Sequence, residues 1–377
     1  MRDIPFNRPA LAGREFEYIQ GAIDSLQLSG NGRFTARCHH ILEDVLRAPK
    51  VLLTTSCTHA LEMTALLTGI GPDDECIMPS FTFVSTVNAF VLRGARPVFV
   101  DIRPDTLNID EARIEQAITG RTRAIVVVHY AGVGCEMDSI LEIARRRGIP
   151  VIEDNAHGLF GRYRGRPLGT FGSMAALSFH ETKNVICGEG GAIVLNRPDD
   201  IERAEIIREK GTDRSRFFRG QVDKYTWVDV GSSYPPSEIL AAFLCAQLEA
   251  RDAIQARRAA LWNRYRTELA DWAARSGAHL PTVPPECDHP AHLFYVLVAT
   301  EDLRDALIRH LKDRGIGAVF HYQPLHLSDM GRRFGGRAGD CPVTEQVSSR
   351  LVRLPLYGSL TDDEQSYVIA SIREFPA

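Results

Sequence analysis

The 377-residue sequence has no long apolar run, little net charge and no apolar leader. No stretch approaches the roughly 20 apolar residues that a membrane-spanning helix needs, and Met1–Pro5 lacks the apolar core of a signal peptide. The formal net charge is −4 and the basic residues are spread along the chain, so neither a nucleic acid nor a membrane is indicated as a partner. We therefore expect a cytoplasmic protein.

The eight cysteines follow no metal-binding or redox pattern. No Cys-x-x-Cys occurs, and the two places where cysteine and histidine stand together, Cys38–His40 and Cys287–His289, lack zinc-finger spacing. We expect reduced, mostly buried cysteines and no metal site.

The first 200 residues alternate between apolar strands and helical patterns. The predicted strands are 50–54, 76–78, 97–101, 123–129, 150–153, 174–179 and 192–195, and the predicted helices are 57–67, 84–92, 109–118 and 137–147. Because the strands are apolar throughout, they predict an α/β fold with a mostly parallel sheet covered on both faces. The turn Gly188–Gly191 joins the last two strands, so the end of the sheet is not expected to be a plain β-α-β repeat.

The second part of the chain has a different pattern. A long helical region runs from Ser237 towards Arg275 and ends before a proline-rich stretch, 281–285. A strand over 293–299, a helix over 303–314 and a short apolar pair at 319–320 then suggest a small α+β domain. We expect a large α/β domain at 1–236, including the N-terminal segment, and a linking helix with a small C-terminal domain at 237–377.

Lysine is scarce, with five lysines against 39 arginines (44 basic residues less five). Only Lys183 follows an apolar strand, Ala175–His180, and precedes a glycine-rich turn. Partial burial lowers the pKa of such a lysine and makes its neutral amine available for a Schiff base. The remaining lysines lie in polar contexts that favour a solvated charge: Lys50, Lys210, Lys224 and Lys312.

Two further features suit pyridoxal phosphate (PLP). The pair Glu153–Asp154 ends a buried strand, at the sheet edge where α/β proteins bind ligands, and one carboxylate could pair with the pyridinium nitrogen. The same residues could instead cap a helix, since Asp and Asn are both good caps. The hydroxyl-rich turn Thr54–Thr58 could hold a phosphate at a helix start, although many strand-to-helix turns look alike.

The main alternative is a dinucleotide site. The strand ending at Tyr130 leads into Gly132 and Gly134, and the acidic pair 153–154 follows about twenty residues later, as in a Rossmann fingerprint. Met137 stands at the third glycine position, where a side chain would obstruct helix–strand packing. The match is therefore incomplete.

Four motifs carry a resemblance to a known family: Pro79–Thr86, Glu153–Gly158, Ser178–Asn184 and Gly188–Gly191. They resemble the sugar-nucleotide aminotransferases of the DegT–DnrJ type, which are PLP enzymes with the aspartate-aminotransferase (fold type I) architecture. The resemblance extends from Ile4–Pro9 to the C-terminal helix. Within the family, the stretch Arg208–Trp227 looks most like transaminases that act on dTDP-4-keto-6-deoxyglucose.

The resemblance implies roles for particular residues. Lys183 would hold PLP as a Schiff base and would be the catalytic residue. The other implied cofactor contacts are Asp154 at the pyridine nitrogen, His157 near the ring oxygen, Phe83 on the ring face, and Ser178 with the backbone of Thr58 and His59 at the phosphate. The implied substrate contacts are Arg219, His321 and Tyr322.

Two positions depart from the family pattern. Asn155 stands where relatives usually have alanine, and we expect it to add a hydrogen-bonding group beside the cofactor. The segment Gly231–Pro236 lacks the asparagine that many relatives supply to the phosphate of the partner subunit. A serine or tyrosine of this segment could replace it.

The implied enzyme is a homodimer with active sites at the subunit boundary. It would transfer the amino group of glutamate to C4 of dTDP-4-keto-6-deoxyglucose, giving a galacto- or gluco-configured 4-amino-4,6-dideoxyhexose. Amination at C3 of a 3-keto isomer and a PLP-binding regulatory homologue without activity remain as alternatives. A 3-dehydratase is disfavoured, because Lys183 is present and no cysteine spacing suits an iron–sulfur cluster.

Overall fold

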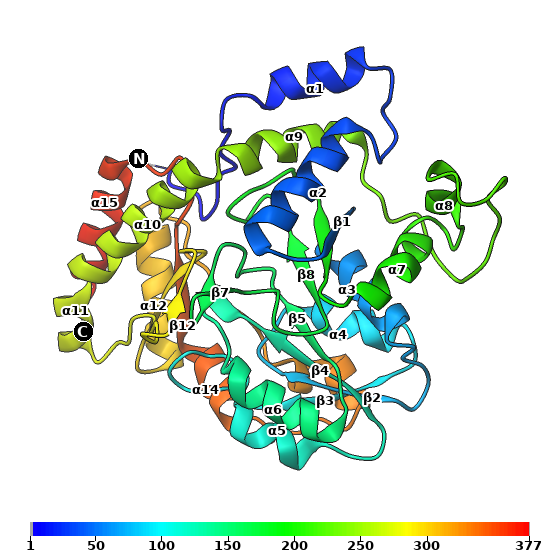
Figure 1. Cartoon of the computed structure of the whole chain (residues 1–377). Helices are drawn as coiled ribbons and strands as arrows, with labels where there is room; N and C mark the ends of the chain where they lie inside the picture. Colours follow the sequence, from blue (N-terminus) through cyan, green and yellow to red (C-terminus); the bar gives the residue numbers. More distant parts are fainter. Residues whose placement is uncertain (1–2, 377) are drawn as a thin grey trace.

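The computed structural model describes residues 3–376 and is built around one large sheet (Figure 1). Its strands are β1 (Lys50–Thr54), β2 (Glu75–Pro79), β3 (Arg96–Val100), β4 (Thr122–Val128), β5 (Val151–Asp154), β8 (Met174–Ser178) and β9 (Gly191–Leu195). Their order is β1-β9-β8-β5-β4-β2-β3, and β9 alone runs against its neighbours β1 and β8. This confirms the predicted α/β class and the irregular end of the sheet.

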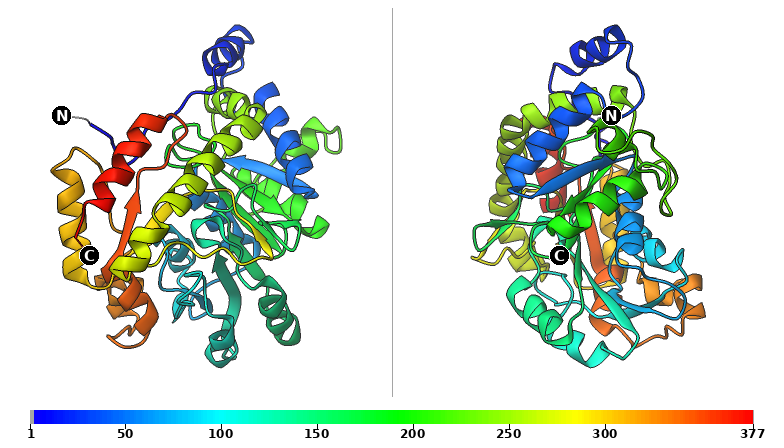
Figure 2. Two further views of the ribbon diagram at one scale, coloured as in Figure 1. Left: turned by 90° about the vertical axis from the view of Figure 1, so that its left-hand side faces the viewer. Right: turned by 45° about the vertical axis from the view of Figure 1, so that its right-hand side comes forward.

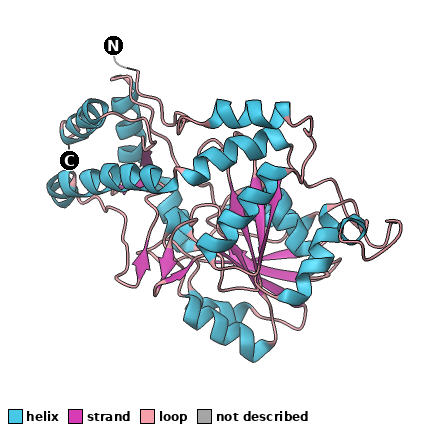
Figure 3. Ribbon diagram, turned by 45° about the horizontal axis from the view of Figure 1, so that its top comes forward, coloured by secondary structure: helices cyan, strands magenta, loops and turns pink. Residues whose placement is uncertain are grey.

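Helices cover both faces of this sheet (Figure 3). One face packs against α2 (Arg33–Leu46), α5 (Glu111–Ala117), α6 (Met137–Arg147) and α9 (Glu238–Glu249); the other packs against α3 (Cys57–Leu67), α4 (Val84–Val91) and α7 (Ile201–Arg208). In β1, Val51 and Leu53 enter one core and Leu52 the other, because successive side chains alternate between faces. Burial on both faces explains why the polar residues of these strands lie mostly at or near strand ends.

The C-terminal part has its own apolar core. It is formed by α10 (Arg251–Glu268), α11 (Ala270–Ser276), α12 (Glu301–Lys312), α15 (Asp362–Arg373) and the antiparallel pair β11 (Phe294–Leu297) and β12 (Leu351–Leu354). Ile4 also belongs to this core, because its N–H donates to Gly315 and its carbonyl accepts from Gly317, both at 2.8 Å. Figure 2 shows this N-terminal segment lying beside the C-terminal helices.

Several short elements complete the chain. They are α1 (Glu15–Asp24), which packs on α9, the helices α8 (Arg214–Phe218), α13 (Asp329–Arg333) and α14 (Pro342–Arg350), and a small sheet of β6 (Arg162–Tyr163), β7 (Arg166–Pro167) and β10 (Cys287–Asp288). Single 3-10 turns lie at Tyr130–Gly132, Pro198–Asp200 and Leu325–Leu327. None of the helices in residues 3–376 combines the length and the apolar character needed to cross a bilayer.

The boundary that we expect between two domains, at residues 236 and 237, stays a proposal. Two segments on opposite sides of this boundary pack against the other part of the chain. Ile4 lies in the C-terminal core, whereas α9 packs with α1 and α2 over the large sheet. The long helical region predicted from Ser237 is three helices, and Ser237 caps the first by accepting the N–H of Leu240 at 3.4 Å.

A buried carboxylate fixes the C-terminal part to the large sheet. Asp101 follows β3 and accepts hydrogen bonds from the N–H groups of Val343 and Thr344, at 2.9 and 2.8 Å. These are free N–H groups of the first turn of α14, where a negative charge is also favoured by the helix dipole. This contact holds β12, which follows α14, in place next to the carboxyl edge of the sheet.

Candidate active site

Lys183 lies in the hairpin loop between β8 and β9. The loop is closed by hydrogen bonds from Glu181 N to Gly188 O and from Cys187 N to Phe179 O, both 2.9 Å. Burial lowers the pKa of Lys183 to about 8, although the nearby Cys57 and Asp154 oppose this effect. A substantial share of this amine is therefore neutral near physiological pH, as a Schiff-base lysine requires.

Asp154 ends β5, the strand beside β8, and faces the same site. Its Oδ2 accepts a 2.6 Å hydrogen bond from the hydroxyl of Thr86, and its Oδ1 accepts from the N–H of Ala156 at 3.2 Å. Burial raises the pKa of Asp154, against the lowering influence of Thr86 and Lys183. Asp154 forms no ion pair within residues 3–376, so this carboxylate can accept a positively charged ligand atom. No helix begins after it, so the helix-cap interpretation is wrong.

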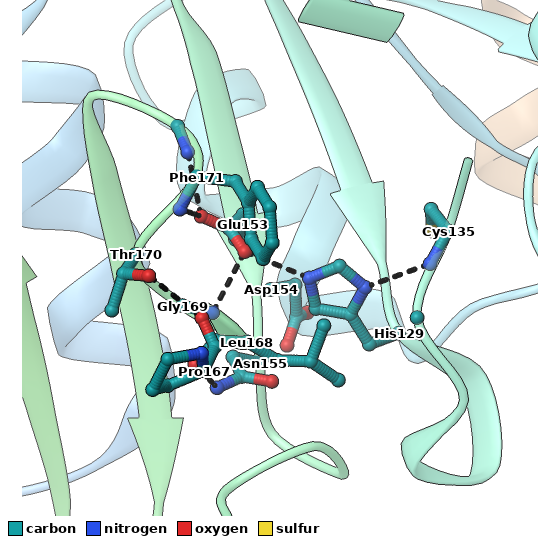
Figure 4. A network of polar contacts seen from close by, with 12 residues as sticks. His129, Cys135, Glu153, Asp154, Asn155, Pro167, Leu168, Gly169, Thr170 and Phe171 are labelled. Atoms are coloured by element: carbon teal, nitrogen blue, oxygen red, sulfur yellow. Dashed lines mark hydrogen bonds and ion pairs between the residues drawn. The ribbon is translucent and has the colours of Figure 1, made fainter. Parts of the chain in front are cut away.

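Glu153 points to the opposite side of the strand and is fully buried (Figure 4). Its carboxylate accepts hydrogen bonds from His129 Nε2 at 2.9 Å and from three backbone N–H groups at 2.7 Å each, those of Gly169, Phe171 and Gly172. All of its acceptor positions are used by the protein. Glu153 therefore braces the fold and is not available to a ligand.

Asn155 does not lie where the sequence predicted. Its side chain is fully buried, and its Nδ2 donates to the carbonyl of Leu168 at 2.9 Å. The carboxamide is enclosed so closely that a Cβ added to Gly158 would come within 2.2 Å of its oxygen. The expectation of a hydrogen-bonding group beside the cofactor was wrong, because Asn155 faces the packed side of the loop.

The start of α3 and the end of β8 meet across Gly191. This glycine pairs with Thr54 on one side and with Ser178 on the other, because β9 lies between β1 and β8. A Cβ on Gly191 would come within 2.4 Å of the backbone nitrogen of Cys57, the first residue of α3. The absence of a side chain therefore allows the helix N-terminus to approach Ser178, and together they form a site suited to a phosphate.

At the N-terminal turn of α3, the backbone N–H of His59 is not available to a phosphate as we expected. The N–H of His59 donates to Ser56 Oγ at 3.1 Å, which is a helix cap. The backbone of His59 is thus already bonded, and the first N–H groups of the helix, at Cys57 and Thr58, are the ones left for a phosphate. The hydroxyl of Thr58 donates to Ser85 Oγ at 2.7 Å.

A group of imidazole and phenol rings lines the side of the site formed by the C-terminal part. His157 stacks on His292 with ring centroids 4.3 Å apart, and its Nε2 lies 3.4 Å from the hydroxyl of Tyr322. His321 Nδ1 lies 3.0 Å from the hydroxyl of Tyr130. Burial lowers the pKa values of His157, His292 and His321 well below the usual range, so these rings are neutral. The Nδ1 atom of His157 is buried without a partner within residues 3–376.

Phe83 lies at the edge of this site, immediately before α4. Its side chain is 57% exposed, and its ring centroid lies 6.3 Å from that of Tyr322. An aromatic ring left this exposed is available to stack on a planar ligand.

Two residues of the site were missed in the sequence. Asn184 Oδ1 lies 2.9 Å from His292 Nδ1, and its Nδ2 donates to Pro290 O at 2.7 Å and to Gln255 Oε1 at 2.9 Å. These contacts fix the residue after Lys183 to the C-terminal part. Asn184 could have been noticed beside the lysine, but no local signal marks His292, which is more than 100 positions away.

Two arginines of the stretch Arg208–Trp227 have different surroundings. Arg208 is buried and braces the backbone through a 2.6 Å hydrogen bond to Leu53 O, so it is not available to a diphosphate. Arg219 is partly exposed and pairs with Glu205 of α7 at 2.7 Å. Within residues 3–376, its side-chain hydrogen bonds and ion pair go to Gln221 and Glu205, and none goes to a residue around Lys183.

The glycines that suggested a dinucleotide site are explained by packing. A Cβ on Gly132 would come within 2.5 Å of Pro290, and one on Gly134 within 3.1 Å of Tyr163. Met137 is fully buried at the start of α6. Within the described residues, no three histidine, cysteine or acidic side chains are arranged to hold a metal ion.

The family model of the DegT/DnrJ/EryC1/StrS aminotransferases matches residues 9–373. The chain belongs to this family. It is 33% identical over 378 residues to the uncharacterized protein MJ1066 of Methanocaldococcus jannaschii, covering 98% of this chain and 97% of that protein. It is 32% identical to DesV of S. venezuelae, solved in complex with a ketimine intermediate, with a TM-score of 0.89 over 99% of this chain and 98% of DesV. It is 26% identical to Spr1654 of Streptococcus pneumoniae, solved in its PLP form, with a TM-score of 0.91 over 99% and 98% of the two chains.

Membership of the DegT/DnrJ/EryC1/StrS family confirms the predicted enzyme class, fold type I and cofactor: the protein is a PLP-dependent sugar aminotransferase. Its own residues fit PLP. Lys183 supplies an amine of lowered pKa and Asp154 a buried carboxylate without a cation within residues 3–376. His157 has a ring nitrogen without a partner in the same residues, and α3 brings a helix N-terminus suited to a phosphate close to Ser178. When bound, PLP supplies an electron sink for the reacting carbon.

Proposed function

We propose that this enzyme transfers the amino group of glutamate to C4 of dTDP-4-keto-6-deoxy-D-glucose, giving a dTDP-4-amino-4,6-dideoxyhexose of galacto or gluco configuration. The observation that supports a nucleotide-linked substrate is the surface of the segment from Arg214 to Trp227. Phe218 and Trp227 are 70% and 77% exposed, and the arginines of this segment include Arg216 and Arg219. Exposed aromatic rings suit stacking on a base, and guanidinium groups suit a diphosphate. The choice of C4 rests on the resemblance of Arg208–Trp227 to the 4-aminating subgroup.

The residues around Lys183 take separate parts in the proposed reaction. Neutral Lys183 removes the α-proton of glutamate as a general base and later delivers a proton to the sugar carbon. When PLP is bound, Asp154 would hold the pyridine nitrogen, Phe83 would cover the ring face, and Thr58 with Ser178 would hold the phosphate. His157 would lie near the ring oxygen, and His321 and Tyr322 would orient the substrate. Because both substrates react at one site in turn, the kinetics are ping-pong.

We propose that the active enzyme is a homodimer with the site at the subunit boundary. Large apolar side chains are exposed on α1 and near α4 and α8, among them Phe16 at 73% and Leu92 at 69%. Exposed apolar surface of this extent favours an interface. Tyr234 is buried against His59 of its own chain, with ring centroids 5.3 Å apart, so the exposed Ser232 and Ser233 are the candidates to reach the partner's phosphate.

A location in the cytoplasm is part of the proposal. All eight cysteines are free, and seven of them are buried. Unpaired cysteines in such number are typical of a reducing compartment.

The sugar is tested with the two keto isomers. The purified enzyme is assayed with glutamate and either dTDP-4-keto-6-deoxyglucose or its 3-keto isomer at matched concentrations. Moving the ketone by one ring position displaces the reacting carbon, and a misplacement of about 1 Å can cost about a hundredfold in rate. We expect kcat/KM to be higher by about that factor for the 4-keto sugar, and an NMR spectrum of the product to give the C4 configuration. A 3-keto sugar that reacts equally well or better would support 3-amination instead.

A further inference from the structure

A chain of hydrogen bonds leads from the start of α4 to the carboxylate of Asp154. The hydroxyl of Thr86 lies 2.6 Å from Asp154 Oδ2, and the hydroxyl of Thr82 lies 2.8 Å from that of Thr86. All three residues are buried, with 1% of Thr82, 0% of Thr86 and 5% of Asp154 exposed. Because burial removes competing water, these contacts have a strong influence on the charge and the orientation of Asp154.

The direction of these hydrogen bonds follows from the groups that form them. An ionised carboxylate can only accept, so Thr86 donates its single hydroxyl proton to Asp154. The oxygen of Thr86 then accepts, and Thr82 is the donor of the 2.8 Å contact. A hydroxyl that accepts one hydrogen bond donates more strongly to the next group, because the bonds of a chain polarise one another.

The two hydroxyls do not take the local partners that threonines in such positions commonly have. In α3, the buried Thr64 donates to the carbonyl of Leu61 in its own helix at 2.7 Å, which is an ordinary contact for a helical threonine. Thr86 of α4 instead donates to a residue 68 positions away in the sequence. Thr82 lies just before α4 but does not cap it, because this helix has no side-chain cap. Long-range packing therefore directs both hydroxyls to the carboxylate of β5.

The two oxygens of Asp154 are bonded unequally. Oδ2 accepts the 2.6 Å hydrogen bond from Thr86, whereas Oδ1 accepts from the N–H of Ala156 at 3.2 Å. Burial raises the pKa of Asp154, and the hydrogen bond from Thr86 is the largest influence that opposes this rise. Without the Thr86 hydroxyl, the buried carboxylate would lose its short hydrogen bond, and its neutral form would be favoured.

We propose that Thr86, itself oriented by Thr82, is a positioning residue for the cofactor: it holds Asp154 as a carboxylate and fixes its plane toward a protonated pyridine nitrogen. A protonated ring is the form that best withdraws electrons from the reacting carbon. Thr86 thus acts on the reaction through Asp154 and not by touching a substrate. This inference rests on the proposed pairing of Asp154 with the pyridine nitrogen, but not on the identity of the sugar or of the amino donor.

The affinity of the protein for the cofactor separates this role from packing alone. The cofactor-free proteins are titrated with PLP and with deaza-PLP, in which C–H replaces the pyridine nitrogen, and fluorescence gives both dissociation constants. Asp154 can pair only with the nitrogen of PLP, so the ratio of the two constants measures that pairing. Thr86→Val removes the hydroxyl at nearly constant shape, and Thr86→Ser keeps it. Thr64→Val is the matched control, since Thr64 is equally buried but bonds only within its own helix.

The expected result is a change of preference and not a general loss of binding. Wild-type protein should bind PLP more tightly than deaza-PLP, and Thr86→Val should lower this preference by roughly tenfold or more, because it loses a hydrogen bond to a charged group. The affinity for deaza-PLP should change little. Thr86→Ser should recover most of the preference, and Thr64→Val should keep all of it.

Thr82→Val extends the test to the first hydroxyl of the chain and replaces Thr86→Val if circular dichroism shows that the latter does not fold. It removes the group that polarises Thr86, so its loss of preference should lie between those of Thr64→Val and Thr86→Val. A wild-type preference in folded Thr86→Val, no recovery in Thr86→Ser, or an equal loss in Thr64→Val would each overturn the inference. Should Thr86→Val not fold, a wild-type preference in Thr82→Val would do the same. Equal affinities of the wild-type protein for the two ligands would overturn the pairing of Asp154 with the nitrogen itself.

Discussion

Two adjacent carboxylates on β5 have opposite functions because of the two-residue repeat of a strand. Glu153 is enclosed by one imidazole and three N–H groups, whereas Asp154 keeps one hydroxyl and one N–H partner and faces the site around Lys183. The sequence could show the pair and favour Asp154 from the alternation of side chains. It could not show what fills the space around Glu153, because His129 lies 24 positions earlier and the three N–H donors lie 16 to 19 positions later.

The two carboxylates should respond differently to loss of charge. Asp154→Asn should leave the melting temperature nearly unchanged but raise the barrier to amino transfer by about 3–5 kcal/mol, which is on the order of a hundredfold or more in kcat/KM. Glu153→Gln should lower the free energy of unfolding by about 3 kcal/mol, because an amide group would face donors that need an acceptor. Denaturant unfolding and steady-state kinetics on both variants check this. If Glu153→Gln folds but has a larger kinetic defect than Asp154→Asn, the two strand faces are assigned the wrong way round.

Lys183 should be the only lysine needed for both cofactor attachment and catalysis. Lys183→Ala should lose the violet-region absorbance of the PLP Schiff base and all amino transfer, because Lys183 is the lysine that acts on Asp154 and His157 among the described residues. Lys224→Ala, in an exposed segment, serves as the matched control and should retain both properties. Unchanged absorbance in Lys183→Ala would remove the basis of the assignment.

The lowered pKa of Lys183 gives a prediction on pH. An amine reacts with acylating reagents only when neutral, so cofactor-free enzyme should be labelled at Lys183 with a rate that rises with pH and has its midpoint near 8. Below that pH the ammonium form is unreactive, and above it the rate should level off. Mass spectrometry of peptides labelled at several pH values measures the midpoint. A midpoint close to the value of an exposed lysine, about 10.4, would contradict the burial described above.

At the scale of elements, the sheet and the helices over it were predicted well because their apolar residues follow clear periods. The predicted 50–54, 57–67 and 137–147 coincide with β1, α3 and α6. Helices α1 and α2 were not predicted, and neither were the two-residue strands β6, β7 and β10. Such short strands form only where distant segments meet, so no local sequence pattern predicts them. The same reason hides His292, which long-range packing brings against His157 and Asn184.

The close contact between β9 and α3 predicts that one methyl group added at Gly191 weakens PLP binding. Gly191→Ala places a carbon within 2.4 Å of the Cys57 nitrogen, so the N-terminus of α3 must move away from Ser178. We expect the affinity for PLP to fall by about tenfold or more, while the sheet remains folded. Gly120→Ala is the control, since nothing lies within 4 Å of its added carbon. Fluorescence titration of the cofactor-free proteins measures the dissociation constants, and equal affinities in the two variants would refute this account of the phosphate site.

At the scale of the whole molecule, the exposed apolar residues predict association. Light scattering coupled to size exclusion should give twice the mass of the chain at assay concentrations. On dilution, activity should fall together with the dimer fraction, because Ser232 or Ser233 of one subunit is proposed to complete the phosphate site of the other. Full specific activity in a monomeric fraction would exclude a shared site.

The pairing of Ile4 with Gly315 and Gly317 has a consequence for the order in which the protein is made. A ribosome synthesises the N-terminal segment first, but its partners emerge only after more than 300 further residues have been added. Domains generally fold as units during synthesis. The sheet from β1 to β9 can therefore form before Ile4 pairs with Gly315 and Gly317. The hydrogen bond from Asn7 to Glu181 O, in the loop that carries Lys183, can therefore become lasting only late. Synthesis of the segment that contains Gly315 and Gly317 is therefore expected to precede lasting docking of Ile4–Asn7 beside the loop of Lys183.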